Sequence, residues 1–333
     1  MQSYLKDSEI QVFTLLYYFC LLIGFWMLMR VIYGFLYFLH KQCIRRKLDL
    51  YKRYADPNIK EGSWVVVTGS SDGIGAEYCR QLAQEGFNIV LISRTLTKLK
   101  SVEQECLILN PNIKTKILQK DFSGETSVKF YEDIYAQIKE LDIAMLINNA
   151  GVMNNGTFLE TDFEKIKATI DVDVLHVNQM CSRFLPKLIN RKQKAALINV
   201  ASQIGLMDGC SGTITYSGAK SYVINFTEAL AVEVGDKLDV QCLIPNLTKT
   251  NLLLDISAQQ IFALTPQSCV KGSLRDIGHG EVTTSGDWKH DFMVPFIWHS
   301  SKLRIFQMLT YHTFGNFIKG ELDKITLTKT KNS

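Results

Sequence analysis

Residues 64–75, with the sequence WVVVTGSSDGIG, predict the start of an α/β fold. The first part, Trp64–Thr68, is a short apolar strand, and helical spacing begins at Ile74 and continues to Glu85. The glycines between them let the turn close and let backbone N–H groups approach a pyrophosphate at the positive end of the helix. A glycine cluster alone is weak support for a ligand. Between a buried strand and a helix, it predicts a dinucleotide-binding loop rather than a simple tight turn.

The same alternation of strand and helix continues along the chain. Further apolar strands are expected over residues 88–93, 115–119, 144–148, 195–201 and 239–244. Helices are expected between them, over residues 97–109, 125–140, 163–190 and 214–234. Strands without polar alternation, each followed by an amphipathic helix, predict a parallel sheet covered on both faces. Right-handed crossovers then give a doubly wound parallel sheet, the α/β Rossmann arrangement.

The residue after the second expected strand indicates which nicotinamide nucleotide would bind. This strand ends in Ile92-Ser93-Arg94, and no acidic residue stands there to accept a hydrogen bond from a ribose 2′-OH. A guanidinium suits a 2′-phosphate instead, because it can donate two parallel hydrogen bonds to it. We therefore favour NADP(H) over NAD(H), the alternative being that Arg94 is an ordinary surface arginine.

A tyrosine and a lysine four residues apart form a candidate catalytic pair. Tyr216 and Lys220 would share one helix face, and an ammonium close to a phenol lowers the phenol pKa from about 10. Ser202 follows the fifth expected strand at its carboxyl end, where a hydroxyl could hydrogen-bond a substrate carbonyl oxygen. The YxxxK pattern is common by chance, but it becomes specific in register with the glycine loop, Arg94 and Ser202.

These residues resemble the short-chain dehydrogenase/reductase family from Thr68 to about Thr250. Within it, the chain is similar to the membrane-anchored group of 17β-hydroxysteroid dehydrogenases and very-long-chain 3-oxoacyl-CoA reductases. The supporting segments are TGSSDGIG at 68–75, LISRTLTKL at 91–99, Lys120-Asp121-Phe122, Asn148-Asn149-Ala150-Gly151, Thr283-Thr284-Ser285-Gly286 and the apolar N-terminus. The resemblance implies an NADPH-dependent oxidoreductase that interconverts a lipophilic ketone and its alcohol, either a 17-ketosteroid or a long-chain 3-oxoacyl-CoA. It is compatible with a homodimer.

The resemblance also implies a role for each site residue. Tyr216 would be the acid/base, Lys220 would lower its pKa and hold the nicotinamide ribose, and Ser202 would orient the carbonyl group. Asp121 would contact the adenine, and Asn149 would support the central strand and the cofactor. Pro245 and Thr250 would flank the nicotinamide carboxamide. The implied cofactor-binding residues are Gly69, Ser71, Asp72, Gly73, Ile74, Gly75, Arg94, Asp121, Asn149, Tyr216, Lys220 and Thr250.

Two departures from the family pattern motivate an alternative function. Asp173 stands where the family usually has an asparagine that helps a water link the lysine to solvent, and its charge would raise the Lys220 pKa. Ser202 lies 14 residues before Tyr216, one more than usual, and this could misplace its hydroxyl. The alternative is therefore a non-catalytic, NADP(H)-binding scaffold in lipid metabolism. The sequence leaves open the substrate, the direction of reaction and the oligomeric state.

The N-terminal segment is apolar enough to span a membrane. Residues 12–29 carry no charge, and after Arg30 a second apolar stretch extends to Leu39. Residues 12–39 would form a helix of roughly 42 Å, longer than the ~30 Å hydrocarbon core. We favour an uncleaved anchor over a signal peptide, because the run is too long, lacks a basic region before it and lacks a small-residue cleavage site after it. One span and a hairpin both remain open.

Charges beside this segment predict a cytosolic body. The basic residues that follow it are His40, Lys41, Arg45, Arg46 and Lys47, whereas Lys6, Asp7 and Glu9 precede it. The positive-inside bias therefore leaves the bulk of the chain in the cytosol. Lysines at positions 329 and 331 resemble the KxKxx signal of endoplasmic reticulum membrane proteins, with a solvated lysine-rich tail as the alternative. We expect a protein of the endoplasmic reticulum membrane with a cytosolic catalytic domain.

Composition limits the remaining classes of function. Hydrophobic residues make up 47% of the 333 residues and charged residues 21%, which excludes a disordered chain. The net charge of +4 is too weak to indicate nucleic acid as a partner. The 8 cysteines contain no CxxC pair, so neither a zinc ribbon nor a thioredoxin-type site is indicated and no metal is expected.

We expect four parts along the chain. Residues 1–48 would be the membrane anchor, 49–62 a charged linker, 63–290 the NADP-binding Rossmann catalytic domain and 291–333 an aromatic, partly amphipathic C-terminal region. That last region could pack on the core, line the entrance for a lipophilic substrate or lie on the membrane.

Overall fold

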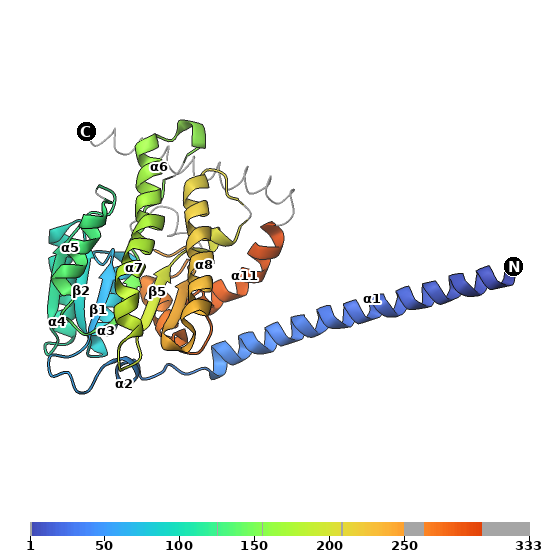
Figure 1. Ribbon diagram of the computed structural model, residues 1–333, viewed down its shortest axis with the longest axis horizontal. Coiled ribbons are helices and arrows are strands. Elements are labelled where there is room, and N and C mark those ends of the chain that lie inside the picture. Colours follow the sequence, from blue (N-terminus) through green and yellow to red (C-terminus); the bar gives the residue numbers. More distant parts are fainter. Residues whose placement is uncertain (1, 125, 155, 208, 250–262, 302–333) are drawn as a thin grey trace. The chain divides into compact units, whose positions relative to one another are not determined.

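The computed structural model describes residues 2–124, 126–154, 156–207, 209–249 and 263–301 (Figure 1). The chain divides into two compact units, Met1–Arg46 and Lys47–Ser333, and each is described by itself. Thr250 and residues 302–333 lie outside the described residues, and so do the lysines of the expected retrieval signal.

A seven-stranded sheet with the order β3-β2-β1-β4-β5-β6-β7 forms the centre of the larger unit. Every neighbouring pair of strands is parallel. The strands are β1 (Trp64–Thr68), β2 (Asn88–Ser93), β3 (Thr115–Gln119), β4 (Ile143–Asn148), β5 (Ala196–Val200), β6 (Asp239–Leu243) and β7 (Thr283–Thr284). This confirms the doubly wound parallel sheet. The six expected strands are all present, and β7 adds a seventh that is too short to show an apolar run.

Helices cover both faces of the sheet (Figure 1). One face carries α3 (Gly73–Gln84), α4 (Leu96–Leu109) and α10 (Pro266–Asp276), and the other carries α5 (Val128–Ile138), α7 (His176–Ile189) and α8 (Ile214–Val234). Side chains of β1 alternate between the two layers: Val65 and Val67 pack with the first set of helices, and Trp64 and Val66 with the second. Each strand is therefore buried on both faces, which explains its uninterrupted apolar sequence.

Shorter elements complete the larger unit. Those that follow the carboxyl ends of the strands are α6 (Phe163–Ile170), α11 (Trp288–Ser301), the 3-10 segments η2 (Phe158–Glu160) and η4 (Gln203–Leu206), and the π-helical segment η3 (Asp171–Leu175). The 3-10 segment η5 (Gly235–Lys237) instead precedes β6, at the edge where the strands begin. The helix expected over residues 163–190 is thus present as α6, η3 and α7 in succession. Single π-turns inside helices often occur at functional sites, because the extra residue redirects the side chains.

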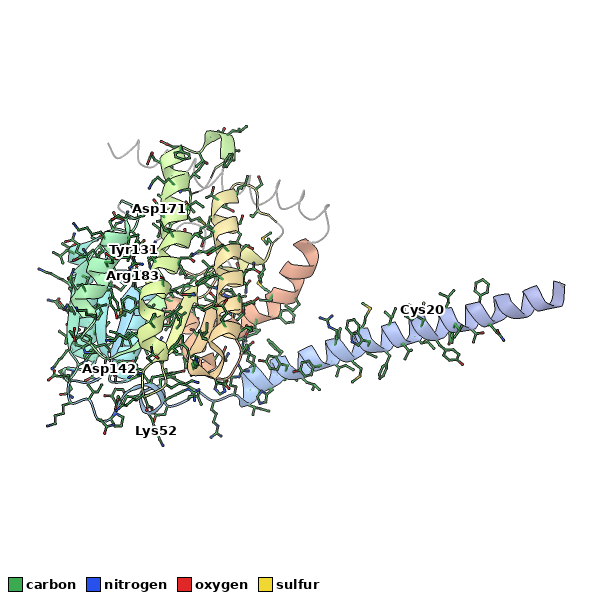
Figure 2. The ribbon with its side chains drawn as sticks, in the orientation of Figure 1. Cys20, Lys52, Tyr131, Asp142, Asp171 and Arg183 are labelled. Atoms are coloured by element: carbon green, nitrogen blue, oxygen red, sulfur yellow. The ribbon has the colours of Figure 1, made fainter. Side chains whose placement is uncertain are left out.

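The smaller unit is dominated by one long helix, α1 (Gln2–Leu39), followed by the π-helical segment η1 (His40–Ile44). Residues 13–44 form a helical stretch that is long and apolar enough to cross a membrane, by length and composition. The large apolar side chains of this stretch, such as Phe19 and Leu22, are exposed. Figure 2 shows side chains projecting from all sides of α1. An exposed surface of this kind is what a membrane-spanning helix presents to lipid, so the segment is consistent with a membrane anchor.

Residues 49–62 differ from the expected linker, because they pack onto the larger unit. Residues Leu50–Tyr54 form the helix α2, with the Asp49 side chain accepting a hydrogen bond from the Lys52 amide at its start. Leu50 and Tyr54 are buried in the same core cluster as α3 and α10. The charged residues hid this role, because few apolar side chains of the segment face inward: Leu50, Tyr54 and Ala55.

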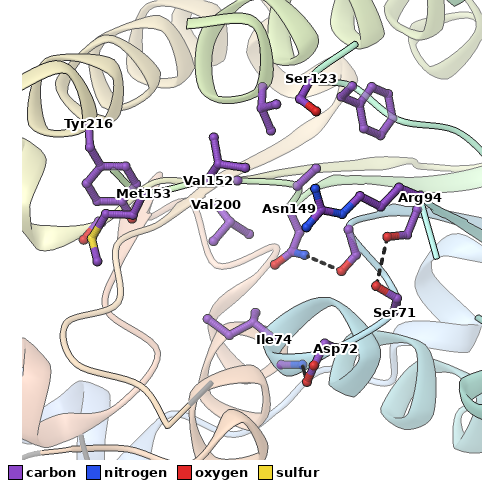
Figure 3. Close-up of a pocket in the computed structure, with 18 of the residues that line it drawn as sticks. Ser71, Asp72, Ile74, Arg94, Ser123, Asn149, Val152, Met153, Val200 and Tyr216 are labelled. Atoms are coloured by element: carbon purple, nitrogen blue, oxygen red, sulfur yellow. Dashed lines mark hydrogen bonds between the residues drawn. The ribbon is translucent and has the colours of Figure 1, made fainter. Parts of the chain in front are cut away.

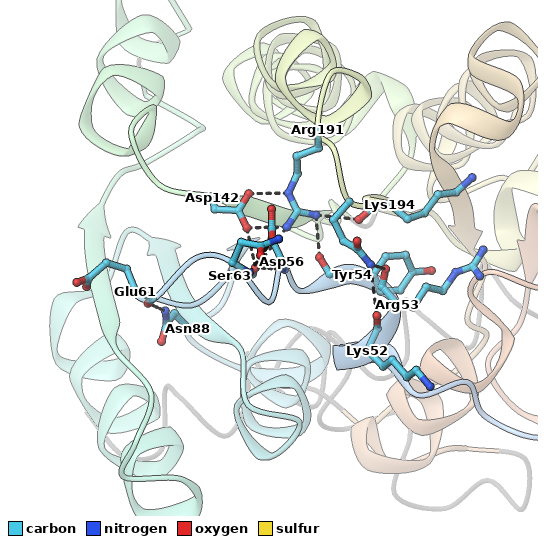
Figure 4. A network of polar contacts seen from close by, with 12 residues as sticks. Lys52, Arg53, Tyr54, Asp56, Glu61, Ser63, Asn88, Asp142, Arg191 and Lys194 are labelled. Carbon is cyan, nitrogen blue, oxygen red and sulfur yellow. Dashed lines mark hydrogen bonds and ion pairs between the residues drawn. The ribbon is translucent and has the colours of Figure 1, made fainter.

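A buried arginine ties this segment to the sheet (Figure 4). The Arg191 guanidinium donates two hydrogen bonds to the Asp142 carboxylate, each 2.6 Å long, and another of 2.8 Å to the Tyr54 carbonyl oxygen. The Ser63 hydroxyl donates to the same carboxylate at 2.6 Å. Only 7% of the Arg191 side chain and 11% of the Asp142 side chain are exposed, so solvent screens this pair weakly.

We expect Arg191→Met to destabilise the protein by about 3–5 kcal/mol, because it leaves the Asp142 carboxylate buried and without its cation. Thermal and urea unfolding of the full chain in detergent measure the effect. Lys192→Met is the matched control, because the substitution removes the same charge from the next position and Lys192 is exposed. Equal stability of the two variants would contradict a structural role for this ion pair.

Candidate functional site

A cleft of about 570 Å³ opens where the parallel strands end (Figure 3). Residues that follow six different strands line it: Gly69 after β1, Arg94 after β2, Asp121 after β3, Asn149 after β4, Ser202 after β5 and Pro245 after β6. The strand order reverses between β1 and β4, because β2 and β3 lie to one side of β1 and β4 lies on the other. Such a switch point is where open α/β sheets bind their ligands.

The glycine loop between β1 and α3 forms one wall of the cleft. Gly69 and Gly73 adopt positive φ angles of 63° and 56°, which side chains rarely tolerate. A Cβ atom on Gly75 would lie 2.4 Å from both the Asn149 Nδ2 and the Gly69 carbonyl oxygen. Gly75 therefore acts by letting the loop close against β4, whereas Gly69 and Gly73 line the cleft itself.

Asn149 and Thr68 hold this loop against the end of β4. The Asn149 Nδ2 donates hydrogen bonds to the carbonyl oxygens of Thr68 at 3.0 Å and Gly69 at 3.2 Å. The Thr68 hydroxyl oxygen accepts from the Asn149 and Ala150 amides, at 3.0 and 3.2 Å. The loop is thus held by hydrogen bonds between the end of β1 and the residues that follow β4.

Arg94 lies at the end of the cleft formed by β2 and β3. Arg94 is exposed, and among the described residues its guanidinium makes no hydrogen bond or ion pair. Partial burial works to raise the pKa of the Asp121 carboxyl, but hydrogen bonds from Ser123 and the charge of Arg94 outweigh it, and the pKa is lowered. A cation with no protein partner at this position is available for an anionic ligand.

Ser71, Asp72 and Ile74 complete the wall beside Arg94. The Ser71 hydroxyl lies 2.9 Å from that of Ser93, and Asp72 Oδ1 accepts a 2.7 Å hydrogen bond from the Gly73 amide at the start of α3. Ile74 lies on the first turn of α3 and faces the cleft (Figure 3). The positive end of the α3 dipole therefore borders the cleft, which favours a phosphate there.

Tyr216, Lys220 and Ser202 meet at the opposite end of the cleft. Tyr216 and Lys220 lie one turn apart on α8, with the ammonium nitrogen 5.5 Å from the centre of the phenol ring. Ser202 stands at the start of η4, and its hydroxyl donates to the Pro245 carbonyl oxygen at 3.3 Å. Ser202 and Tyr216 line the same cleft although they are 14 residues apart in the sequence.

Asp173 lies directly against Lys220, on the π-helical segment η3. The Asp173 Oδ1 is 2.8 Å from the Lys220 Nζ, and 0% and 5% of the two side chains are exposed. The Val152 amide donates to Asp173 Oδ2 at 3.3 Å, and Lys220 also donates to the Val200 carbonyl oxygen at 3.1 Å. The structure therefore places Asp173 at the lysine, as its position along the helix predicts, and provides a buried ion pair there.

Burial and these charges set the pKa values of the pair on α8. Burial raises the pKa of the Tyr216 phenol above its usual value, and the Asp173 charge adds to this, although the Lys220 charge and the nearby Ser202 side chain act in the opposite direction. Burial alone would lower the pKa of Lys220, but the Asp173 carboxylate outweighs it and raises the pKa. The sequence predicts only the lowering effect of Lys220 on Tyr216, because burial of the phenol is a tertiary property.

The structure adds residues that the sequence analysis did not single out. Lys98 lines the cleft from the first turn of α4, and its Nζ lies 3.1 Å from Asp72 Oδ2. Met153 lines the cleft beside Tyr216 (Figure 3), and Asn154 lines the cleft as well. The four-residue spacing from Arg94 does not indicate Lys98, because Arg94 precedes α4 and the two residues do not share a helix. No sequence signal indicates Met153 and Asn154, because their place follows from the path of a loop.

We expect Gly75→Ala to weaken binding of NADP(H) at least tenfold and to lower the melting temperature, because its methyl group collides with Asn149 and the loop backbone. Fluorescence titration of the full chain with NADPH measures the binding. Gly218→Ala on α8 is the control, since a Cβ there meets nothing within 4 Å. Unchanged binding in Gly75→Ala would show that the loop does not hold the cofactor.

Comparison with known proteins gives consistent matches over the larger unit. The family model described as short chain dehydrogenase matches residues 63–261. The very-long-chain 3-oxoacyl-CoA reductase of Coccidioides immitis is 33% identical over 242 residues, which cover 70% of this chain and 68% of the relative. The protein of the same name from Candida glabrata is 34% identical over 240 residues, which cover 68% of this chain and 67% of the relative.

Solved structures share the fold at lower identity. A 7beta-hydroxysteroid dehydrogenase superposes with a TM-score of 0.68 at 23% identity, covering 79% of this chain and 99% of that one. A short-chain dehydrogenase from Sphingobium yanoikuyae in complex with NADPH gives a TM-score of 0.61 at 23% identity, covering 67% of this chain and 87% of that one. At this identity the likeness supports the arrangement of strands and helices.

Proposed function

The chain belongs to the short-chain dehydrogenase/reductase family of oxidoreductases, and we propose that it reduces a long-chain 3-oxoacyl-CoA with NADPH at a membrane. Members of this family bind a nicotinamide cofactor. The observation that carries the proposal is the meeting of Ser202, Tyr216 and Lys220 at one end of a cleft whose other end is the glycine loop. The residues fit the cofactor, since the cleft combines a loop open to a pyrophosphate with an unpaired arginine.

In the proposed reaction each residue acts on a stated atom. When bound, the reduced nicotinamide supplies the hydride that adds to the 3-carbonyl carbon. Ser202 hydrogen-bonds the carbonyl oxygen and stabilises the negative charge that develops on it. Tyr216 donates its hydroxyl proton to the same oxygen, and Lys220 holds a positive charge beside the phenol as it loses that proton. In this proposal Asp121 contacts the adenine and Asn149 holds the glycine loop. Thr250 lies outside the described residues.

The choice of NADPH rests on Arg94. Its guanidinium lies exposed at the rim of the cleft, at the end of β2, where an acid would be needed to hold an unphosphorylated ribose. Lys98 adds a second cation on the same side. Two cations favour the extra phosphate of NADPH through charge-assisted hydrogen bonds.

The choice of substrate and compartment rests on the relatives and on the N-terminal helix. The two relatives with 33% and 34% identity are named very-long-chain 3-oxoacyl-CoA reductases. A long acyl chain partitions into a bilayer, and the helical residues 13–44 are consistent with anchoring the enzyme beside it. The endoplasmic reticulum, a cytosolic catalytic domain and a homodimer remain predictions. The exposed Phe292 on α11 belongs to the expected aromatic C-terminal region, residues 291–333, which is described only to Ser301.

We expect the purified full chain in detergent to oxidise NADPH with a long-chain 3-oxoacyl-CoA. Tyr216→Phe should lower kcat by about 10²–10⁴-fold with NADPH binding retained, because the ring stays and only the acidic proton is lost. Tyr222→Phe is the matched control: Tyr222 lies on the same helix, but its hydroxyl donates outward to Asn178 at 2.9 Å.

The outcomes of this assay separate the candidate functions. Unchanged turnover in Tyr216→Phe would remove the assigned role of Tyr216. Turnover of a 17-ketosteroid alone would keep the oxidoreductase and replace the substrate. Tight NADPH binding without turnover of either substrate would support the non-catalytic scaffold.

We expect Arg94→Gln to raise the KM for NADPH by about 10–100-fold and to leave the KM for NADH nearly unchanged, because one charge-assisted hydrogen-bonding group is lost. Steady-state kinetics with both cofactors measure the split. Lys100→Gln removes the same charge from an exposed position on α4 outside the cleft lining and serves as the control. An equal loss with both cofactors would refute recognition of the 2′-phosphate by Arg94.

A further inference from the structure

A buried carboxylate belongs to the catalytic end of the cleft, although it does not line the cleft itself. Asp173 is completely buried, and its Oδ1 lies 2.8 Å from the Lys220 Nζ. Lys220 in turn lies beside Tyr216 on α8. The charge on Lys220 is therefore shared between a carboxylate on one side and the phenol on the other. Breaking this ion pair would therefore change the pKa of the Tyr216 hydroxyl.

The surrounding chain is shaped to hold this carboxylate. The π-turn η3 carries Asp173 inward, and the Val152 amide donates to its Oδ2 at 3.3 Å. Gly151 leaves the necessary space, because a Cβ there would lie 2.9 Å from Asp173 Oδ1 and 3.4 Å from Lys220 Nζ. Burial opposes the charge on Asp173, but a neutral acid would leave the Lys220 ammonium buried without a counter-ion. The ionised pair is therefore favoured.

The other titratable groups close to this pair are neutral around pH 7. His176 on α7 is buried, and burial lowers its pKa to about 3. Cys242 on β6 is buried, and burial raises its pKa to about 12. Among the described groups that act on Tyr216 and Lys220, Asp173 is therefore the negative charge and Lys220 the positive one.

We propose that Asp173 is a positioning residue that sets the pH range of the reaction, by offsetting the charge of Lys220 and so keeping the Tyr216 hydroxyl protonated at neutral pH. This inference rests on the proposed function. Reduction needs the protonated phenol: the hydride forms a C–H bond at the carbonyl carbon, the C=O π bond opens, and the phenol proton passes to oxygen. The ketone is reduced and NADPH is oxidised. Alcohol oxidation runs the same step backwards and needs the phenolate to accept the hydroxyl proton.

The pKa values of the site agree in sign with this assignment. Burial raises the pKa of Tyr216, and Asp173 raises it further against the lowering effect of Lys220. Near pH 7 the phenol is then protonated and ready for reduction. Alcohol oxidation should appear only at alkaline pH, where the phenolate forms. Removing the Asp173 charge leaves Lys220 uncompensated, which stabilises the phenolate and moves both pH profiles to lower pH.

We expect Asp173→Asn to move the alkaline rise of alcohol oxidation, and the alkaline fall of ketone reduction, to lower pH by about one to three units. kcat/KM is measured over pH in both directions, with a 3-oxoacyl-CoA and its 3-hydroxy product, using the full chain in detergent. Asp171→Asn is the matched control: it removes the same charge from the same π-turn, where Asp171 pairs with Lys167 instead. Asp173→Glu should keep the wild-type profile.

A second readout does not depend on turnover. The full chain with 3-fluorotyrosine at position 216 is titrated by 19F NMR in detergent, and the wild-type resonance should titrate above the pH found for the free amino acid. In Asp173→Asn it should titrate lower than in wild type. A wild-type value below that of the free amino acid, or equal values in both proteins, would overturn the inference. Absence of turnover with these titrations intact would refute only the proposed substrate.

Discussion

The parallel pairing of β1 with β4 is the constraint on which the rest of the site depends. Thr68 ends β1 and accepts hydrogen bonds from the Asn149 and Ala150 amides beyond β4, while the Asn149 side chain returns two hydrogen bonds to the loop. This cross-strand contact closes the glycine turn and places it beside the residues that follow β4 and β5. The phosphate end and the catalytic end therefore share one cleft.

At the catalytic end of this cleft, oppositely charged side chains lie inside the apolar core. Two charges are buried at Lys220 and Asp173, which costs desolvation free energy unless each offsets the other. The π-turn and the absence of a side chain at Gly151 let them approach. The buried ion pair lies where the proposed reaction moves a proton, and perturbed pKa values concentrate at such sites.

The amino-acid sequence predicted most of the fold and the family because both depend on local patterns. Apolar strands, intervening amphipathic helices and the TGSSDGIG turn identify a doubly wound sheet wherever they follow one another. The sequence pattern did not predict the parts of the structure that depend on a few contacts between residues far apart in the chain. Residues 49–62 read as a linker because Leu50 and Tyr54 are two apolar side chains among charges, and Arg191 reaches them from far along the chain. β7 is too short to carry a pattern at all.

By itself the sequence determined the order of the strands and helices, the residues that end each strand and the pairing of Tyr216 with Lys220 on one helix face, because these follow from backbone periodicity. Tertiary structure alone decided that Ser202 lines the same cleft as Tyr216 despite the longer spacing, that Asp173 and Lys220 form a buried ion pair, and that the phenol is buried. These depend on how loops and a π-turn are packed across the sheet. Burial and the distances between charges are set by that packing, and they fix the pKa values.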